Sequence, residues 1–88
     1  MNRAQLSAAA WDTSEKAHAA LAKALAFPDY YGHNLDALHD CLASLTDTQL
    51  VITNCGEASR KMDKWPGFLA VFCDAAAENP GLDIRLMP

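Results

Sequence analysis

The sequence predicts a small α/β protein, in which a three-stranded parallel sheet packs against about four helices in the order β-α-α-β-α-α-β. Two observations lead to this fold class. The run Leu50–Thr53 is continuously apolar and β-branched, as is typical of a buried strand. On both sides of this run, apolar residues recur at helical spacing. Because helical crossovers separate successive strands, those strands should run parallel.

The first half of the chain should hold one strand and one helix before its central loop. The segment Arg3–Ser7 is a short candidate strand, although alanine and glutamine give it little β-propensity. Asp12 and Glu15 have the spacing of a capping box that opens a helix. Pro28 should end this helix, because proline restricts the residue before it. The expected inner face consists of Ala17, Ala20, Leu21 and Ala24.

A second helix should follow the loop at residues 29–33. Asn34 is a good N-cap for it, because an asparagine side chain accepts a hydrogen bond from the first turn. Its apolar stripe comprises Leu35, Leu38, Leu42 and Leu45.

After the strand at Leu50–Thr53, two helices and a last strand are expected. Glu57–Lys64 is a weak polar helix, and Pro66 suits the first turn of a stronger one. Asn79-Pro80-Gly81 is a turn signal, and Leu82–Met87 reads as the last strand. The inner face of the stronger helix should comprise Phe68, Leu69, Phe72, Ala75 and Ala76, and both tryptophans, Trp11 and Trp65, are expected to pack in the core.

Length and composition favour a single domain over residues 1–88, since 51% of the residues are apolar. We expect a cytoplasmic protein, because no apolar stretch is long enough to span a membrane or form a signal-peptide core. Three cysteines without a CxxC pair fit neither a disulfide framework nor a zinc site, and they are predicted to be small buried thiols: Cys41, Cys55 and Cys73. No cofactor is expected.

The charge is unevenly distributed. The net charge is −4, and no lysine or arginine occurs between Lys23 and Arg60. This acidic stretch should attract basic partners and repel phosphates, which makes nucleic-acid binding improbable because that requires a basic stripe. A merely solvated acidic surface remains an open interpretation. The acidic residues of the stretch are Asp29, Asp36, Asp40, Asp47 and Glu57.

Asp36 and Asp40 form the most informative pair, because their i,i+4 spacing puts both carboxylates on one exposed face of the second helix. His39 belongs to the same side. Two like charges at this spacing destabilise a helix slightly, and Asp40 lies too far along the helix to benefit from its dipole. Tyr30 and Tyr31, in the loop just before, suit a protein interface, and for Tyr31 a place at the edge of the core is an equal alternative.

The run from Phe27 to Leu42, FPDYYGHNLDALHDCL, resembles the signature of the barstar family of intracellular ribonuclease inhibitors. Weaker similarity continues through Leu21, the Leu50–Thr53 strand and Asp83-Ile84. The resemblance implies that the loop and second helix plug a ribonuclease active site, with Asp40 in the place of an RNA phosphate. It implies a partner-binding set of Tyr30, Tyr31, Gly32, Asn34, Asp36, His39, Asp40 and, on the last helix, Asp74.

By this resemblance the protein is not an enzyme but a monomer that binds, one-to-one, a small basic extracellular ribonuclease or ribonuclease toxin. The family has an aromatic residue at the positions of His39 and Leu45, so the partner here need not be a barnase-type enzyme. Two other functions stay open. One is a general acidic adaptor for another basic protein. The other is a small metal-dependent hydrolase with His33, Asp36, His39 and Asp40 as ligands.

Overall fold

A three-stranded parallel sheet is the central element of the computed structural model, which describes residues 2–88. Its strands are β1 (Asn2–Ser7), β2 (Thr48–Thr53) and β3 (Leu82–Leu86), in the spatial order β1-β2-β3. The register pairs Asn2 with Thr48, and Thr48 with Leu82. The predicted fold class is therefore confirmed, including the β-α-α-β-α-α-β order.

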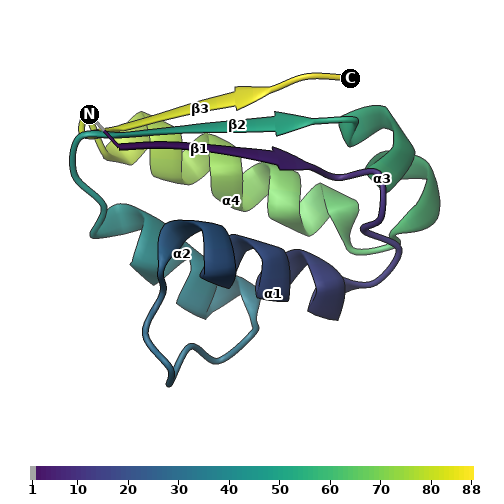
Figure 1. The fold of residues 1–88 in the computed structure, drawn as a ribbon, viewed down its shortest axis with the longest axis horizontal. Coiled ribbons are helices and arrows are strands. Elements are labelled where there is room, and N and C mark those ends of the chain that lie inside the picture. Colours follow the sequence, from purple (N-terminus) through teal and green to yellow (C-terminus); the bar gives the residue numbers. More distant parts are fainter. Residues whose placement is uncertain (1) are drawn as a thin grey trace.

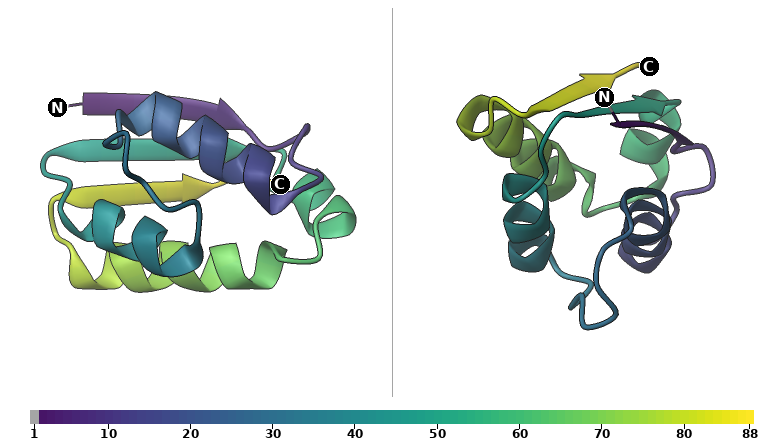
Figure 2. Two further views of the ribbon diagram at one scale, coloured as in Figure 1. Left: turned by 90° about the horizontal axis from the view of Figure 1, so that it is seen from below. Right: turned by 60° about the vertical axis from the view of Figure 1, so that its left-hand side comes forward.

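Three helices cover one face of this sheet: α1 (Ser14–Leu25), α2 (Leu35–Ala43) and α4 (Trp65–Glu78) (Figure 1). The short helix α3 (Cys55–Lys61) follows β2 at the end of the sheet. Viewed from the helical side, α2 and α4 lie next to each other and α1 runs along β1 (Figure 2). The core fills the space between the sheet and these helices, and its largest fully buried side chains are Phe68, Phe72, Leu21, Leu38, Leu42, Leu50 and Ile52.

The start of α1 differs from the prediction. Thr13, not Asp12, is the N-cap, and its hydroxyl accepts a hydrogen bond from the backbone N–H of Lys16 at 3.3 Å. Asp12 instead forms an ion pair with Lys16 at 2.9 Å. Either residue type can cap a helix, so the neighbouring ion pair favours the later start.

The end of α1 was also predicted wrongly. The helix stops at Leu25, before Pro28 can act, because Ala26 adopts a left-handed conformation with φ 54°. The N–H groups of Ala26 and Phe27 both bond to the carbonyl of Ala22, which satisfies an otherwise open helix end. On the inner face, His18 is buried, whereas Ala24 is exposed.

Smaller differences concern the second half. Helix α3 begins at Cys55 and ends at Lys61, and β3 ends at Leu86. Leu69, predicted to face the core, is exposed, because the buried side of α4 is formed by Trp65, Phe68, Phe72 and Ala75. Trp11 and Trp65 are both buried, as predicted. Among the free thiols, Cys55 is buried but Cys73 is exposed, so the prediction of three buried cysteines is wrong.

Two contacts fix α2 against α4. The side-chain amide of Asn79, just after α4, donates to the carbonyls of Leu42 at 2.9 Å and Leu45 at 2.8 Å, at the end of α2. At the other end, a Cβ atom on Gly67 would lie 2.7 Å from Leu35 Cδ1, so glycine permits the close approach of the two helices there. The exposed surface of α2 is thereby held at a fixed position beside that of α4.

Candidate functional site

The loop between α1 and α2 presents one tyrosine and buries the other. The side chain of Tyr30 is 87% exposed, whereas Tyr31 is only 8% exposed. The Tyr31 ring packs on Phe27, with 4.9 Å between ring centroids, and its backbone N–H bonds to the carbonyl of Pro28. Of the two readings left open for Tyr31, the structure therefore favours the core-capping one.

Tyr31 is anchored to α1 through a buried hydrogen bond. Its hydroxyl lies 2.5 Å from Nδ1 of His18. Burial raises the pKa of the Tyr31 phenol, which stays protonated at neutral pH. Burial also lowers the pKa of His18, and the positive charge of a protonated His33 would act in the same direction. A neutral imidazole and a neutral phenol therefore share this hydrogen bond.

Gly32 and Asn34 shape the transition from the loop into α2. As predicted, Asn34 is the N-cap: its Oδ1 accepts from the N–H of Ala37 at 2.8 Å. Its Nδ2 donates to the carbonyl of Gly32 at 3.2 Å. A Cβ atom at Gly32 would lie 2.9 Å from that same Nδ2, so a larger residue would displace the cap. Asn34 is thus already occupied by its own helix.

Asp36 and Asp40 are both exposed on α2, one turn apart, as predicted. Neither carboxylate forms a hydrogen bond or ion pair with any residue in the described part of the chain. Asp36 lies in the first turn, where the helix dipole favours a negative charge, but the last turn of α2 carries no basic residue. These two charges therefore face the solvent uncompensated.

His39 reaches across to α4. Its Nε2 atom lies 2.7 Å from Oε2 of Glu78. Asp74, the site residue predicted on the last helix, is exposed one turn before Glu78. We define the acidic face as Asp36, Asp40, Asp74 and Glu78, with His39 joining its α2 and α4 parts.

His33 points to yet another element, where its Nδ1 contacts the Glu15 carboxylate of α1. The four side chains considered as metal ligands, His33, Asp36, His39 and Asp40, therefore do not converge. Within residues 2–88, no cluster of three or more histidine, cysteine, aspartate or glutamate residues is arranged to hold a metal ion.

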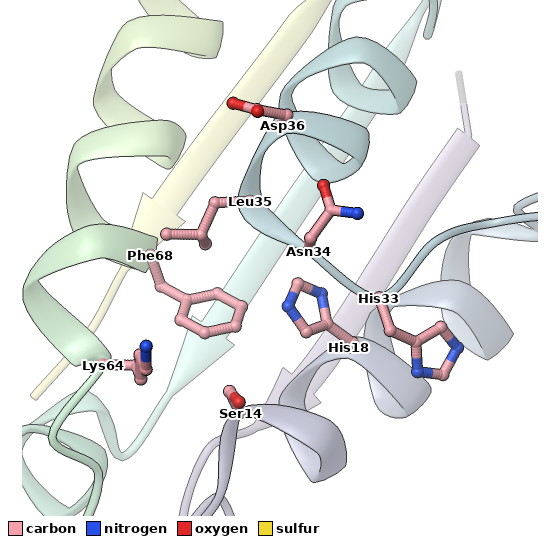
Figure 3. A pocket seen from close by; sticks show the side chains of 8 residues that line it. All are labelled: Ser14, His18, His33, Asn34, Leu35, Asp36, Lys64 and Phe68. Atoms are coloured by element: carbon pink, nitrogen blue, oxygen red, sulfur yellow. The ribbon is translucent and has the colours of Figure 1, made fainter.

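A pocket of about 350 Å³ opens beside the acidic face, where the first residues of α1 and α2 approach the start of α4 (Figure 3). His18 and Phe68 lie at its centre, with Asp36 toward one end and Lys64 toward the other. The pocket is lined by Ser14, His18, His33, Asn34, Leu35, Asp36, Lys64 and Phe68.

His18 and Glu78 organise this region without having been singled out in the sequence, and Glu15, assigned there to a capping box, contacts His33 instead. His18 had a local signal, because it precedes Leu21 and Leu25 by three and seven residues and so shares their helical face. Glu78 follows Asp74 by one turn, but its partner His39 is 39 residues distant, and no local pattern reveals such a pair.

The fold and the acidic face together define a class: a small α/β protein that presents a carboxylate surface on two adjacent helices and an exposed tyrosine in the loop before one of them. Comparison with known families specifies it further. The sequence model of Barstar (barnase inhibitor) matches residues 1–87. The chain therefore belongs to the barstar family, as its sequence signature predicted.

A similar protein of Bacillus subtilis (strain 168) is described as "Putative ribonuclease inhibitor YrdF". It is 48% identical over 42 residues, which cover 48% of this chain. The match spans 46% of the relative, so the chain is aligned with about half of that protein's length. None of the helices in residues 2–88 has the length and apolar character that a membrane span requires.

Proposed function

We propose that this protein inhibits a small ribonuclease by covering its basic active site with the acidic face and the loop before α2. The proposed contact residues are Tyr30, Tyr31, Gly32, Asn34, Asp36, His39, Asp40 and Asp74. Asp40 takes the place of an RNA phosphate. Membership of the barstar family and the ribonuclease-inhibitor description of the Bacillus relative support this class of activity.

The single observation that carries the proposal is the exposure of Asp36 and Asp40, which form no ion pair with any cation among residues 2–88. A ribonuclease cleft must offer positive charge and hydrogen-bond donors to bind phosphate. Carboxylates satisfy the same donors, and charge-assisted hydrogen bonds of this kind are the strong ones. Since neither aspartate stabilises the protein through an ion pair, a basic partner is the natural counterpart.

The loop supplies the second part of the surface. Tyr30 offers a large exposed ring with few rotatable bonds, which favours binding at low entropic cost. Tyr31 and Asn34 have internal partners, so we assign them mainly to holding Tyr30 and Gly32 in position.

The experiment is an inhibition assay of purified protein against barnase and a panel of small microbial ribonucleases, at equal enzyme concentration. We expect at least one enzyme to be inhibited at a one-to-one ratio, and gel filtration with light scattering to show a monomer becoming a binary complex. The Asp36→Asn/Asp40→Asn variant should lose inhibition. Asp83→Asn, on the outer side of β3, changes one exposed charge away from the acidic face and should retain it. Inhibition unaffected by the double variant would refute the proposed surface.

A further inference from the structure

His39 and Glu78 form a contact that crosses from α2 to α4. The distance from Nε2 to Oε2 is 2.7 Å, and the two side chains are 35% and 63% exposed. This contact lies within the acidic face and in reach of an approaching partner. Histidine supplies the donor for this contact, whereas a phenylalanine ring at position 39 would have no polar atom to donate to Glu78.

The contact determines which nitrogen of a neutral His39 carries the proton. An ionised carboxylate only accepts hydrogen bonds, so the nitrogen that faces Glu78 must be the donor. A neutral imidazole has one donor and one acceptor, and Nδ1 is therefore the acceptor. Nδ1 makes no hydrogen bond within the described residues. It is left available to an N–H donor from outside.

The charged residues of α2 and α4, the two helices joined by His39, are all acidic. Asp36 and Asp40 lie on the same helix, and Asp74 and Glu78 lie on α4. Neither α2 nor α4 contains a lysine or arginine. A partner that binds this face must bring its cations close to position 39, where they would repel an imidazolium and accommodate a neutral ring.

We propose that His39, positioned by Glu78, makes binding selective for a partner that directs an arginine or lysine N–H at Nδ1, and that complex formation expels any proton held on that atom. This inference rests on the proposed function, since it concerns the same surface. It adds a recognition rule: the partner meets a neutral hydrogen-bond acceptor at position 39, between carboxylates, and binds less tightly when this acceptor is protonated.

The test is isothermal titration calorimetry with barnase, or with the tightest ribonuclease of the panel, between pH 5 and pH 8. Each pH is measured in two buffers of different ionisation enthalpy, which gives the number of protons released. The native protein should release more protons below neutral pH than His39→Gln. As the pH is lowered, the affinity of the native protein should fall relative to that of His39→Gln. The fall should be at most about tenfold per pH unit, which is the limit for one linked proton. Equal proton release by the two proteins would overturn the proposal.

His33→Gln is the matched control, because it makes the same change at a histidine held by Glu15 instead. Its proton release on binding should lie closer to that of the native protein than the release of His39→Gln does. If this variant, and not His39→Gln, abolishes proton release, the assignment to His39 is wrong. The difference in proton release between the native protein and a variant also cancels the contribution of titrating groups on the ribonuclease, because the same enzyme is used for both.

A second measurement tests the role of Glu78 on the free protein. The ¹⁵N chemical shifts of the imidazole ring at pH 8 should identify the Nε2–H form of His39, and Glu78→Ala should give a mixture of both forms. A native protein that already shows the mixture would overturn the positioning role of Glu78. Failure of every ribonuclease to bind would instead refute the proposed function and its proton linkage, while this measurement still decides the contact.

Discussion

The Tyr31 hydroxyl lies 2.5 Å from Nδ1 of His18, and this one hydrogen bond ties the loop before α2 to the buried side of α1. The two residues are 13 positions apart in sequence. Around them, the ring of His18 packs on Phe68, with 4.8 Å between centroids, so the loop is joined to the core by both polar and apolar contacts. The exposed Tyr30 is therefore presented next to a residue that is anchored in the core.

Tyr31→Phe should destabilise the protein. The substitution keeps the ring but leaves a buried nitrogen of His18 without its partner, which costs about 1–3 kcal/mol. Urea unfolding followed by circular dichroism measures this loss. Tyr30→Phe is the control, because the Tyr30 side chain is exposed and its hydroxyl makes no hydrogen bond in the described chain; its unfolding midpoint should not move. Equal midpoints for both variants would show that the buried hydrogen bond contributes nothing.

Stability should fall as the pH drops below about 6.5. Burial lowers the pKa of His18 from its ordinary value of 6.5, and His33 acts in the same direction. The unfolded chain then binds a proton that the folded protein resists, so the contribution of His18 is complete above pH 6.5 and is lost as the pH falls through the lower folded value. Urea midpoints measured from pH 8 to pH 5 should trace this fall. His18→Gln should have a flatter profile, and parallel profiles would contradict the assignment.

Asn79→Ala should destabilise the packing of α2 on α4. The Asn79 amide donates to carbonyls at the end of α2, while its Oδ1 accepts from the N–H of Gly81 at 2.9 Å. Losing bonds to partly buried carbonyls should lower the free energy of unfolding by about 1–3 kcal/mol. Asn79→Asp separates the two roles, because it keeps the acceptor and removes the donors. Its stability should fall at least as far, since a negative charge also meets a helix C-terminus. If Asn79→Asp is as stable as the native protein, the destabilisation in Asn79→Ala comes from the lost bond between Oδ1 and the N–H of Gly81, and not from the lost bonds to α2.

Asp40→Ala should weaken the complex with the inhibited ribonuclease more than any other single truncation on the acidic face, followed by Asp36→Ala. Removing one partner from a desolvated charge pair costs about 2–5 kcal/mol. Titration calorimetry measures this loss. Asp83→Ala, on the outer side of the sheet, should bind as the native protein does. An unchanged affinity for Asp40→Ala would reject the assignment of Asp40 as a phosphate mimic.

Local sequence signals predicted much of the fold and the position of the aspartates. Asn34 caps α2, and the predicted run Leu50–Thr53 forms the last four residues of the strand Thr48–Thr53, because each is encoded by neighbouring residues. Asp12 and Thr13 are adjacent, and both are residue types that can cap a helix. Thr13 caps α1 in the structure because Asp12 forms an ion pair with Lys16, which the sequence alone did not indicate. Periodicity also finds the centre of a buried stripe better than its margins, which explains why the exposed Leu69 was assigned to the core.

The orientation of His39 was beyond any local reading. Periodicity places His39 on the side of Asp36 and Asp40, but the ring direction depends on how closely α4 approaches α2. That approach is set by Gly67 and Asn79, which lie far along the chain. Likewise, the buried His18 satisfies the helical stripe only because Tyr31 gives its ring nitrogen a partner. A buried polar side chain such as His18 becomes predictable once its hydrogen-bond partner is also known.

Association with the ribonuclease should slow steeply as the ionic strength rises. The uncompensated charges of Asp36 and Asp40 attract a basic enzyme over a distance that salt shortens to about 8–10 Å near 0.1–0.15 M. Stopped-flow measurement of the association rate from low to high salt tests this, and the dissociation rate should change much less.

Asp36→Asn and Asp83→Asn each remove one negative charge, but only Asp36→Asn removes it from the acidic face. The rate for Asp36→Asn should therefore depend less on salt than that for Asp83→Asn. If the salt dependence of the association rate falls equally in the two variants, the attraction comes from the net charge of the protein rather than from the acidic face. A rate that does not respond to salt would mean that these carboxylates are only a solvated surface.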